Sequence, residues 1–374
     1  MSFRPFAMER WQSTWENRVA YNLSESGVHP VSVAELLGLA GGSSIDDVLL
    51  GYGQSNGSDV LRERIAALYT GASEANVMVT NGSAEANFVA IWQLVEPGDE
   101  VAVVMPAYMQ TPGLVEAFGG TVRKIRLHPD HAWQPDPDEI RRAITDRTRL
   151  VVVTNPNNPT GAVLGEEARV ALIEATGRTG TWLLADEVYT GAERSGPETP
   201  SFFGAHPRVL ATGSMSKAYG MPGLRIGWVV ADPAVAEQLW ARTDYTTISA
   251  GDLTDTLASL ALRTDVRPRL IERTRGYIER GLAVLEEWMA AQGGFDHRAP
   301  DAGAICFARY AAPIPSDVLA ERLRVERSLL IVPGEHFGFE RHLRFGFGME
   351  TDRLEAALER LGEQLATAAT TAAH

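Results

Sequence analysis

The sequence predicts an α/β fold in which a mainly parallel seven-stranded sheet is flanked by helices. Seven short β-rich, apolar runs suit buried strands, at residues 77–80, 100–105, 121–127, 150–154, 182–185, 209–212 and 226–230. Amphipathic stretches at 84–94, 138–144 and 166–176 lie between them. Such alternation is typical of a parallel sheet with helices on both faces, and ligands bind such sheets at the carboxyl ends of the strands.

The pattern changes in the last third of the chain. Helical stretches at 273–291, 317–325 and 352–367 are separated by a few strands, which predicts a second, smaller α+β domain. We expect residues 46–275 to form the large domain and residues 1–45 and 276–374 to form the small one.

Composition excludes several classes of protein. The 374 residues carry a net charge of −14, which argues against nucleic acid as a partner because phosphate backbones need clustered Lys and Arg. The single cysteine, Cys306, excludes an internal disulfide framework, gives no metal cluster and suits a small buried hydrophobe. Because the sequence shows no apolar signal segment and no run of about 18 apolar residues, we expect a cytoplasmic protein that does not bind membranes.

Lys217 is the most informative residue of the chain. It follows the strand 209–212 in a glycine-rich turn, and Arg225 lies eight residues further on. Desolvation and a cationic neighbour would lower the pKa of such a lysine and let it attack a carbonyl to form a Schiff base. Arg225 would then hold a phosphate. The combination predicts pyridoxal 5'-phosphate (PLP) as the cofactor.

Two other loops offer polar groups directly after predicted strands. In 80–86, the first helical amides, those of Ser83 and Ala84, would face an anion, although a purely structural turn is an equal alternative. In Asn155-Pro-Asn-Asn-Pro-Thr-Gly161, two prolines and a glycine fix a rigid loop from which Asn158 offers an amide donor. The alternative there is an Asn-Pro turn without a ligand.

Asp186 ends the predicted strand 182–185, and Tyr189 follows three residues later. A carboxylate at a buried strand end needs a cationic partner or several donors, and a protonated pyridine nitrogen is such a partner. The alternative is a cap on the next helix. Tyr189 is either a core residue or a hydroxyl that points into the same site.

These motifs resemble a known family. Asn-Pro-Thr-Gly, Asp-x-x-Tyr and Ser-x-Ser-Lys with an arginine eight residues later are similar to those of class I and II aminotransferases, which are fold type I PLP enzymes. The resemblance runs in order over residues 22–365. It implies that Lys217 holds PLP and shuttles a proton, and that Asp186 keeps the pyridine nitrogen protonated.

The resemblance also implies the remaining contacts of the cofactor. Asn158 and Tyr189 would hydrogen-bond the 3-hydroxyl oxygen, and Tyr108 would stack on the ring. The residues expected around the phosphate are Ser83, Ala84, Ser214, Ser216 and Arg225. Tyr52, in Gly51-Tyr-Gly53, resembles a tyrosine that reaches a phosphate of the partner subunit, which implies a homodimer with shared active sites.

Substrate contacts are implied at fewer positions. Arg344, in His342-Leu-Arg-Phe-Gly346, resembles the arginine that binds the substrate α-carboxylate as a bidentate pair. Without the family, a surface arginine on a strand edge is the simpler interpretation. Gly27, Asn158 and Glu25 are the other expected substrate contacts.

The chain departs from the commoner pattern near residue 27. Asn22-Leu-Ser-Glu-Ser-Gly-Val-His-Pro30 replaces a Gly-x-x-Pro-type turn and resembles a subgroup that contains capreomycidine synthase, which cyclises a hydroxylated arginine. One hypothesis is that Glu25 or a nearby serine faces the distal end of the substrate and that His29 is an extra acid or base near Cβ or Cγ. The alternative, weighed equally, is that both residues cap and pack an N-terminal turn.

The resemblance therefore leaves two functions open. The leading prediction is an aminotransferase that moves an α-amino group from an L-amino acid to a 2-oxo acid. The alternative is a PLP-dependent cyclase or lyase of arginine-derived amino acids, or a PLP-dependent amino-acid oxidase. An effector-sensing domain of a transcription factor is set aside because the sequence has no basic helix.

Overall fold

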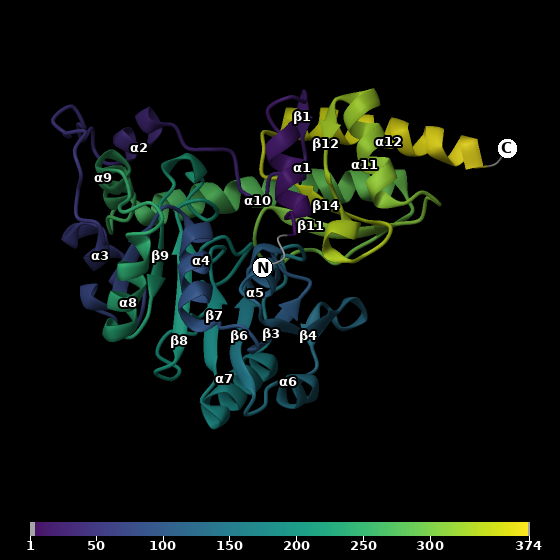
Figure 1. Ribbon diagram of the computed structural model, residues 1–374. Coiled ribbons are helices and arrows are strands. Elements are labelled where there is room, and N and C mark those ends of the chain that lie inside the picture. Colours follow the sequence, from purple (N-terminus) through teal and green to yellow (C-terminus); the bar gives the residue numbers. More distant parts are fainter. Residues whose placement is uncertain (1–3, 373–374) are drawn as a thin grey trace.

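A computed structural model describes residues 4–372 of the chain, with side chains to residue 367. Figure 1 shows the large sheet and its flanking helices at the lower left and the C-terminal elements, in yellow and light green, at the upper right. The long helix α10 (Arg267–Gln292) runs between the two parts.

The large sheet has the strand order β2-β9-β8-β7-β6-β3-β4-β5. Neighbours pair in parallel from β8 to β4, and β9 runs antiparallel to both β8 and β2. The strands are β2 (Val77–Thr80), β3 (Glu100–Met105), β4 (Thr121–His128), β5 (Gln134–Pro135), β6 (Thr148–Thr154), β7 (Trp182–Asp186), β8 (Val209–Ser214) and β9 (Gly227–Val230). The seven predicted strands are confirmed. The predicted number is one too low, because the two-residue β5 adds an antiparallel edge that is too short to show as an apolar run.

Helices cover both faces of this sheet. Along β6, Val151 and Val153 pack in a cluster with residues of α6 and α7, whereas Leu150 and Val152 pack with α4 and α8. A strand that is buried on both faces reads as a continuous apolar run, which is why the sequence predicts these strands well. The helices named in this part of the fold are α3 (Asp59–Ala66), α4 (Ser83–Leu94), α5 (Gln110–Ala117), α6 (Pro137–Ala143), α7 (Glu166–Thr179), α8 (Pro233–Thr243) and α9 (Asp252–Ala261).

The second part of the fold is built on two small sheets. One has the order β10-β11-β14-β13, and in the other β1 pairs in parallel with β12. Its elements are β1 (Tyr21–Asn22), β10 (Phe295–Asp296), β11 (Ile305–Tyr310), α11 (Ser316–Arg327), β12 (Leu329–Leu330), β13 (Val332–Pro333), β14 (His342–Gly346) and α12 (Thr351–Ala372). Cys306 lies fully buried in β11, as expected.

The N-terminal segment touches both parts of the fold. α1 (Ala7–Trp15) lies beside the C-terminal elements and contacts β13, whereas α2 (Val33–Leu39) contacts α9. The proposed division at residues 45 and 275 stays a prediction. The remaining short elements are the 3-10 helices η1 (Glu74–Asn76), η2 (Pro129–His131), η3 (Pro222–Leu224) and η4 (Gly334–Phe337).

Close packing between α10 and the end of β14 yields a stability prediction. A Cβ added at Gly281 would overlap the carbonyl oxygen of Phe347, which is backbone and cannot rotate away. We expect Gly281→Ala to lower the free energy of unfolding by about 1–3 kcal/mol, the usual cost of overpacking a core. Denaturant unfolding of the purified protein measures this change.

Gly276 is a matched control on the same helix. Its added Cβ would meet only the mobile end of Arg280, at 3.1 Å. Because alanine favours a helix over glycine by about 1 kcal/mol, Gly276→Ala should leave stability unchanged or raise it. Equal destabilisation by both substitutions would contradict the packing argument.

Candidate active site

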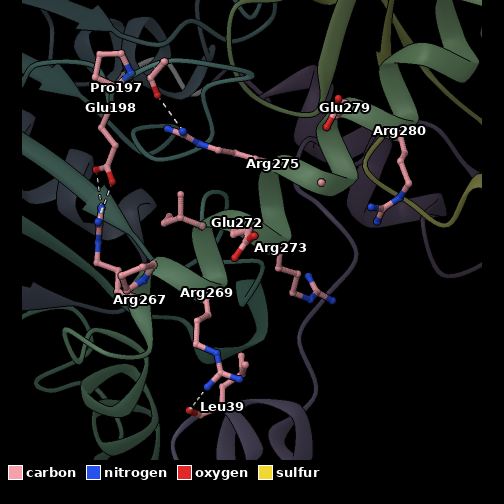
Figure 2. Close-up of a pocket in the computed structure, with 14 residues that line it drawn as sticks. Leu39, Pro197, Glu198, Arg267, Arg269, Glu272, Arg273, Arg275, Glu279 and Arg280 are labelled. Atoms are coloured by element: carbon pink, nitrogen blue, oxygen red, sulfur yellow. Dashed lines mark hydrogen bonds and ion pairs between the residues drawn. The ribbon is translucent and has the colours of Figure 1, made fainter.

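A cavity of about 400 Å³ lies where the loops after β2, β3, β6, β7 and β8 meet the N-terminal segment. This is the carboxyl-terminal edge of the large sheet, where such folds bind ligands. The predicted site residues that line it are Glu25, Ser83, Ala84, Tyr108, Asn158, Asp186, Tyr189, Ser216, Lys217 and Arg225. A larger, open cleft of about 1090 Å³ runs along α10 and contains none of them (Figure 2).

The amine of Lys217 is bound by a carboxylate. Lys217 Nζ donates to Glu25 Oε1 at 3.1 Å, and the amides of Ser26 and Gly27 donate to the same oxygen at 2.8 Å each. Burial alone would raise the pKa of Glu25, but the Lys217 ammonium and the Gly27 amide outweigh it and lower this pKa to about 2.

The same contact corrects the expectation for Lys217. Burial by itself lowers the pKa of its amine, but the Glu25 carboxylate outweighs burial, so the pKa is raised rather than lowered. The sequence did not predict this outcome because the two residues are 192 positions apart in the chain.

Asp186 is buried at the end of β7. Its Oδ2 accepts a hydrogen bond from Asn87 Nδ2 at 2.9 Å, and Oδ1 accepts one from the Val188 amide at 3.3 Å. Burial raises the pKa of this carboxyl despite both donors, so a cationic ligand group beside it would be stabilised. Thr212 in turn donates to Asn87 Oδ1 at 3.1 Å. Sequence reasoning missed Asn87, although a lone asparagine in the apolar helix 84–94 was an available signal.

Two glycines shape an anion cradle at the start of α4. A Cβ added at Gly227 would overlap the Ser83 amide nitrogen, and one added at Gly82 would overlap the Arg225 guanidinium. The backbone amides and Arg225 therefore face the same end of the cavity, as a phosphate requires. Ser214 pairs with Gly227 between β8 and β9, and its hydroxyl accepts a hydrogen bond from the Ser216 amide at 3.2 Å.

Arg344 is buried rather than on the surface, so the surface alternative is wrong. Its side chain is 1% exposed, and its Nη1 donates to Asn158 Oδ1 at 3.0 Å. Its Nη2 donates to the Ser24 carbonyl at 2.5 Å. Burial lowers the pKa of this guanidinium. Among the described residues, neither Arg344 Nε nor Tyr189 Oη has a hydrogen-bond partner, although both atoms are buried.

Helix α1 contributes an acidic wall that the sequence did not predict. Glu9, Gln12 and Glu16 line the cavity together with Glu25. Tyr108 Oη donates to Glu9 Oε1 at 2.7 Å, and Gln12 Nε2 donates to the Ser24 carbonyl at 2.8 Å. Burial and the neighbouring carboxylates raise the pKa of Glu16. The i, i+3, i+7 spacing of Glu9, Gln12 and the C-cap residue Glu16 was the available signal.

The described lining of the 400 Å³ cavity lacks five of the predicted site residues. These are Gly27, His29, Tyr52, Ser214 and Arg344. Gly27 nevertheless lies against Lys217, since its added Cβ would be 3.8 Å from Lys217 Cδ. Tyr52 is 88% exposed. His29 lines a neighbouring cavity of about 250 Å³, whose wall includes Glu16 and Glu25. The roles predicted for these residues stay predictions.

The arrangement fits PLP. Lys217 offers an amine, the Gly82–Gly227 cradle fits a phosphate, and the buried Asp186 suits a protonated ring nitrogen. The unpartnered Tyr189 hydroxyl lines the same space and can donate to a ring oxygen.

Comparison with known proteins supports a PLP-binding site. The profile of the family "Aminotransferase class I and II" matches residues 34–361, so the chain belongs to this family. Capreomycidine synthase from Streptomyces vinaceus is 35% identical over 96% of this chain and 93% of its own length. An aspartate/prephenate aminotransferase from Thermus thermophilus is 30% identical over 85% of this chain and 84% of its own.

Solved structures show the same fold. A PLP-dependent aminotransferase from Streptococcus suis superposes with a TM-score of 0.92 at 31% identity, covering 98% of this chain and 99% of the other. The PLP-dependent cyclase OrfR has a TM-score of 0.89 at 29% identity, covering 98% of both chains. The protein is therefore a fold type I enzyme with PLP as its cofactor. Within residues 4–372, no helix is long and apolar enough to cross a membrane and no group of side chains suits a metal ion.

The glycine cradle gives a prediction about cofactor binding. In Gly227→Ala, the new methyl group would displace the Ser83 amide from the phosphate position. We expect PLP affinity to fall at least tenfold, about 1.4 kcal/mol, with the apo-protein still folded. Fluorescence titration of the apo-protein with PLP measures this constant.

Gly223→Ala is the control, because an added Cβ there meets no described atom within 4 Å. Equal PLP affinities of the two variants would contradict a phosphate-binding role of the Gly82–Gly227 cradle.

Proposed function

We propose that this enzyme acts on an α-amino acid whose side chain ends in a cation, and that it transfers the α-amino group to a 2-oxo acid. The observation that supports this proposal is the set of charges in one cavity. The described lining holds four carboxylates, Glu9, Glu16, Glu25 and Asp186, but only two cations, Lys217 and Arg225. Arg344 is buried beside Asn158 at the same site.

Bound PLP changes this balance. Arg225 would hold its phosphate, Asp186 would face its ring nitrogen, and the amine of Lys217 would be engaged by its carbonyl carbon. The α-carboxylate of the substrate then suits Arg344. Two carboxylates, Glu9 and Glu16, remain without a cation of their own, and Glu25 has only Lys217. A guanidinium or ammonium at the distal end of the substrate supplies the missing charge and several N–H donors.

We assign roles to this chain's own groups accordingly. When bound, PLP supplies an electron-withdrawing ring that acidifies the substrate Cα–H. Lys217 then holds and returns the Cα proton. Asp186 fixes the charge of the ring nitrogen, while Asn158 and Tyr189 orient the ring and Tyr108 packs on it. Arg344 orients the α-carboxylate, so the Cα–H bond faces Lys217.

A second candidate is elimination with ring closure on the same class of substrate. Amino transfer needs one proton carrier at Cα, whereas elimination also needs a group that holds a proton near Cβ or Cγ. Glu16, which lines the same cavity and whose carboxyl pKa is raised, is such a group. The similarity to capreomycidine synthase and to the cyclase OrfR supports the same candidate.

We also propose that two copies associate. Leu49, Leu50, Tyr52 and Tyr245 are large apolar or aromatic side chains that are 79–89% exposed. Exposed side chains of this kind suit a protein interface, and a second copy would let Tyr52 reach the phosphate of its partner. The cytoplasmic location stays a prediction.

A substrate panel tests the proposed function. Arginine, hydroxyarginine, lysine, glutamate, aspartate and leucine are each added to the holoenzyme with and without a 2-oxo acid, and products are measured by mass. We expect turnover of the cationic amino acids, with amino transfer seen as a new 2-oxo acid and elimination seen as loss of water or ammonia. Preference for glutamate or aspartate would contradict the proposal.

The acidic wall can be tested separately. Glu16→Gln keeps the shape of the side chain but removes its charge, so kcat/KM for arginine should fall about tenfold while that for leucine changes little. Glu174→Gln, on α7 and outside the cavity, is the control. An equal loss for arginine and leucine would indicate a general structural effect and would contradict a charge-specific contact.

A further inference from the structure

The turn at residues 25–30 is held from two sides. On one side, the His29 amide donates to the Gly348 carbonyl at 2.6 Å, and Val28 forms a parallel bridge with Gly348. On the other side the turn meets α10. Because Glu25 Oε1 accepts from the Ser26 and Gly27 amides, the position of this turn sets the position of the Glu25 carboxylate.

The ring of His29 packs against α10 and does not line the cavity that contains Lys217. It stacks on Tyr277 with ring centroids 5.8 Å apart and planes 26° apart. His29 Nε2 is 3.9 Å from Glu350 Oε1, which also accepts a hydrogen bond from Tyr277 Oη at 2.6 Å. The imidazole is therefore engaged by an aromatic face and a carboxylate outside the 400 Å³ cavity.

Arg273 holds the backbone of the same turn. Its Nη1 donates to the His29 carbonyl at 2.8 Å and its Nη2 to the Pro30 carbonyl at 3.4 Å. Its Nε donates to Glu35 Oε1 at 2.7 Å. Figure 2 shows Arg273 on α10, in the cleft described above, and its side chain is only 15% exposed. Among the described residues, all acceptors of the Arg273 side chain lie in residues 29–35.

We propose that His29 and Arg273 are positioning residues that hold the Glu25 carboxylate beside Lys217, and that His29 does not itself transfer a proton. The inference rests on the proposed function, in which the Glu25 carboxylate acts beside Lys217 as its counter-charge. It replaces the acid–base hypothesis for His29 with an indirect role. Its physical basis is that a displacement of about 1 Å at a reacting group is enough to cost about a hundredfold in rate.

The test compares five variants by two readouts. The variants are Glu25→Gln, His29→Ala, His29→Phe, Arg273→Met and Arg280→Met. One readout is the pH midpoint of the cofactor absorbance in the holoenzyme. The other is the pH dependence of Lys217 acylation in the apo-protein, followed by peptide mass spectrometry, which does not depend on turnover.

The direction of the shift follows from the ion pair. The Glu25 carboxylate raises the pKa of Lys217, so losing it or moving it away lowers that pKa. We expect Glu25→Gln, His29→Ala and Arg273→Met to shift both midpoints to lower pH and to reduce kcat/KM about tenfold or more. His29→Phe keeps the stacking on Tyr277, and we expect it to keep the parent midpoints.

Arg280→Met is the matched control. Arg280 stacks on Tyr277 at 5.0 Å, much as Arg273 does at 4.8 Å, but among the described contacts it makes no hydrogen bond to the turn. We expect no shift in this variant. If Arg273→Met does not fold, Arg273→Lys replaces it, and the midpoints should then lie between those of the parent and of His29→Ala.

The outcomes separate the two proposals. If Glu25→Gln leaves both midpoints unchanged, the proposed role of Glu25 is wrong and this inference falls with it. If Glu25→Gln shifts them but His29→Ala and Arg273→Met do not, only the positioning role is overturned. An inactive His29→Phe with parent midpoints would establish proton transfer by His29 and would likewise overturn it.

Discussion

The contact between Lys217 and Glu25 organises the active site, because it joins two chain segments that are 192 positions apart. Lys217 belongs to a loop of the large sheet, whereas Glu25 lies next to β1, which pairs with β12 in the other part of the fold. A partly buried ammonium requires a counter-charge, and here that charge comes from the N-terminal segment. The cavity therefore has a complete wall only when this segment lies across the sheet edge.

Close backbone approach makes this crossing possible. A Cβ at Gly346 would overlap the carbonyl of Glu25, and a Cβ at Gly348 would overlap the carbonyl of Gly27. These glycines follow Arg344 by two and four residues, so one short stretch provides both the buried guanidinium and the surface on which residues 25–28 lie. The position of Glu25 and that of Arg344 are consequently coupled through a single strand end.

The sequence predicted the parts of the site that depend on local patterns. Lys217, Asp186 and Asn158 each follow a doubly buried strand, and parallel strands bring their carboxyl ends to one edge. Asn87 and Glu9 were missed because their roles depend on which distant group each one faces, Asp186 for the first and Tyr108 for the second. The raised pKa of Lys217 was missed for the same reason.

The cofactor contacts and the acidic wall lie in different segments of the chain, which explains why the cofactor is easier to infer than the reaction. The family profile begins at residue 34, and the expected PLP contacts of one subunit all lie beyond it. The carboxylates of the acidic wall, Glu9, Glu16 and Glu25, all precede it. In our proposal, the segment outside the common profile meets the distal end of the substrate and adds the Glu25 carboxylate beside Lys217. Reaction outcome would then change through this segment while the cofactor site stays constant, which is how one fold supports different chemistry.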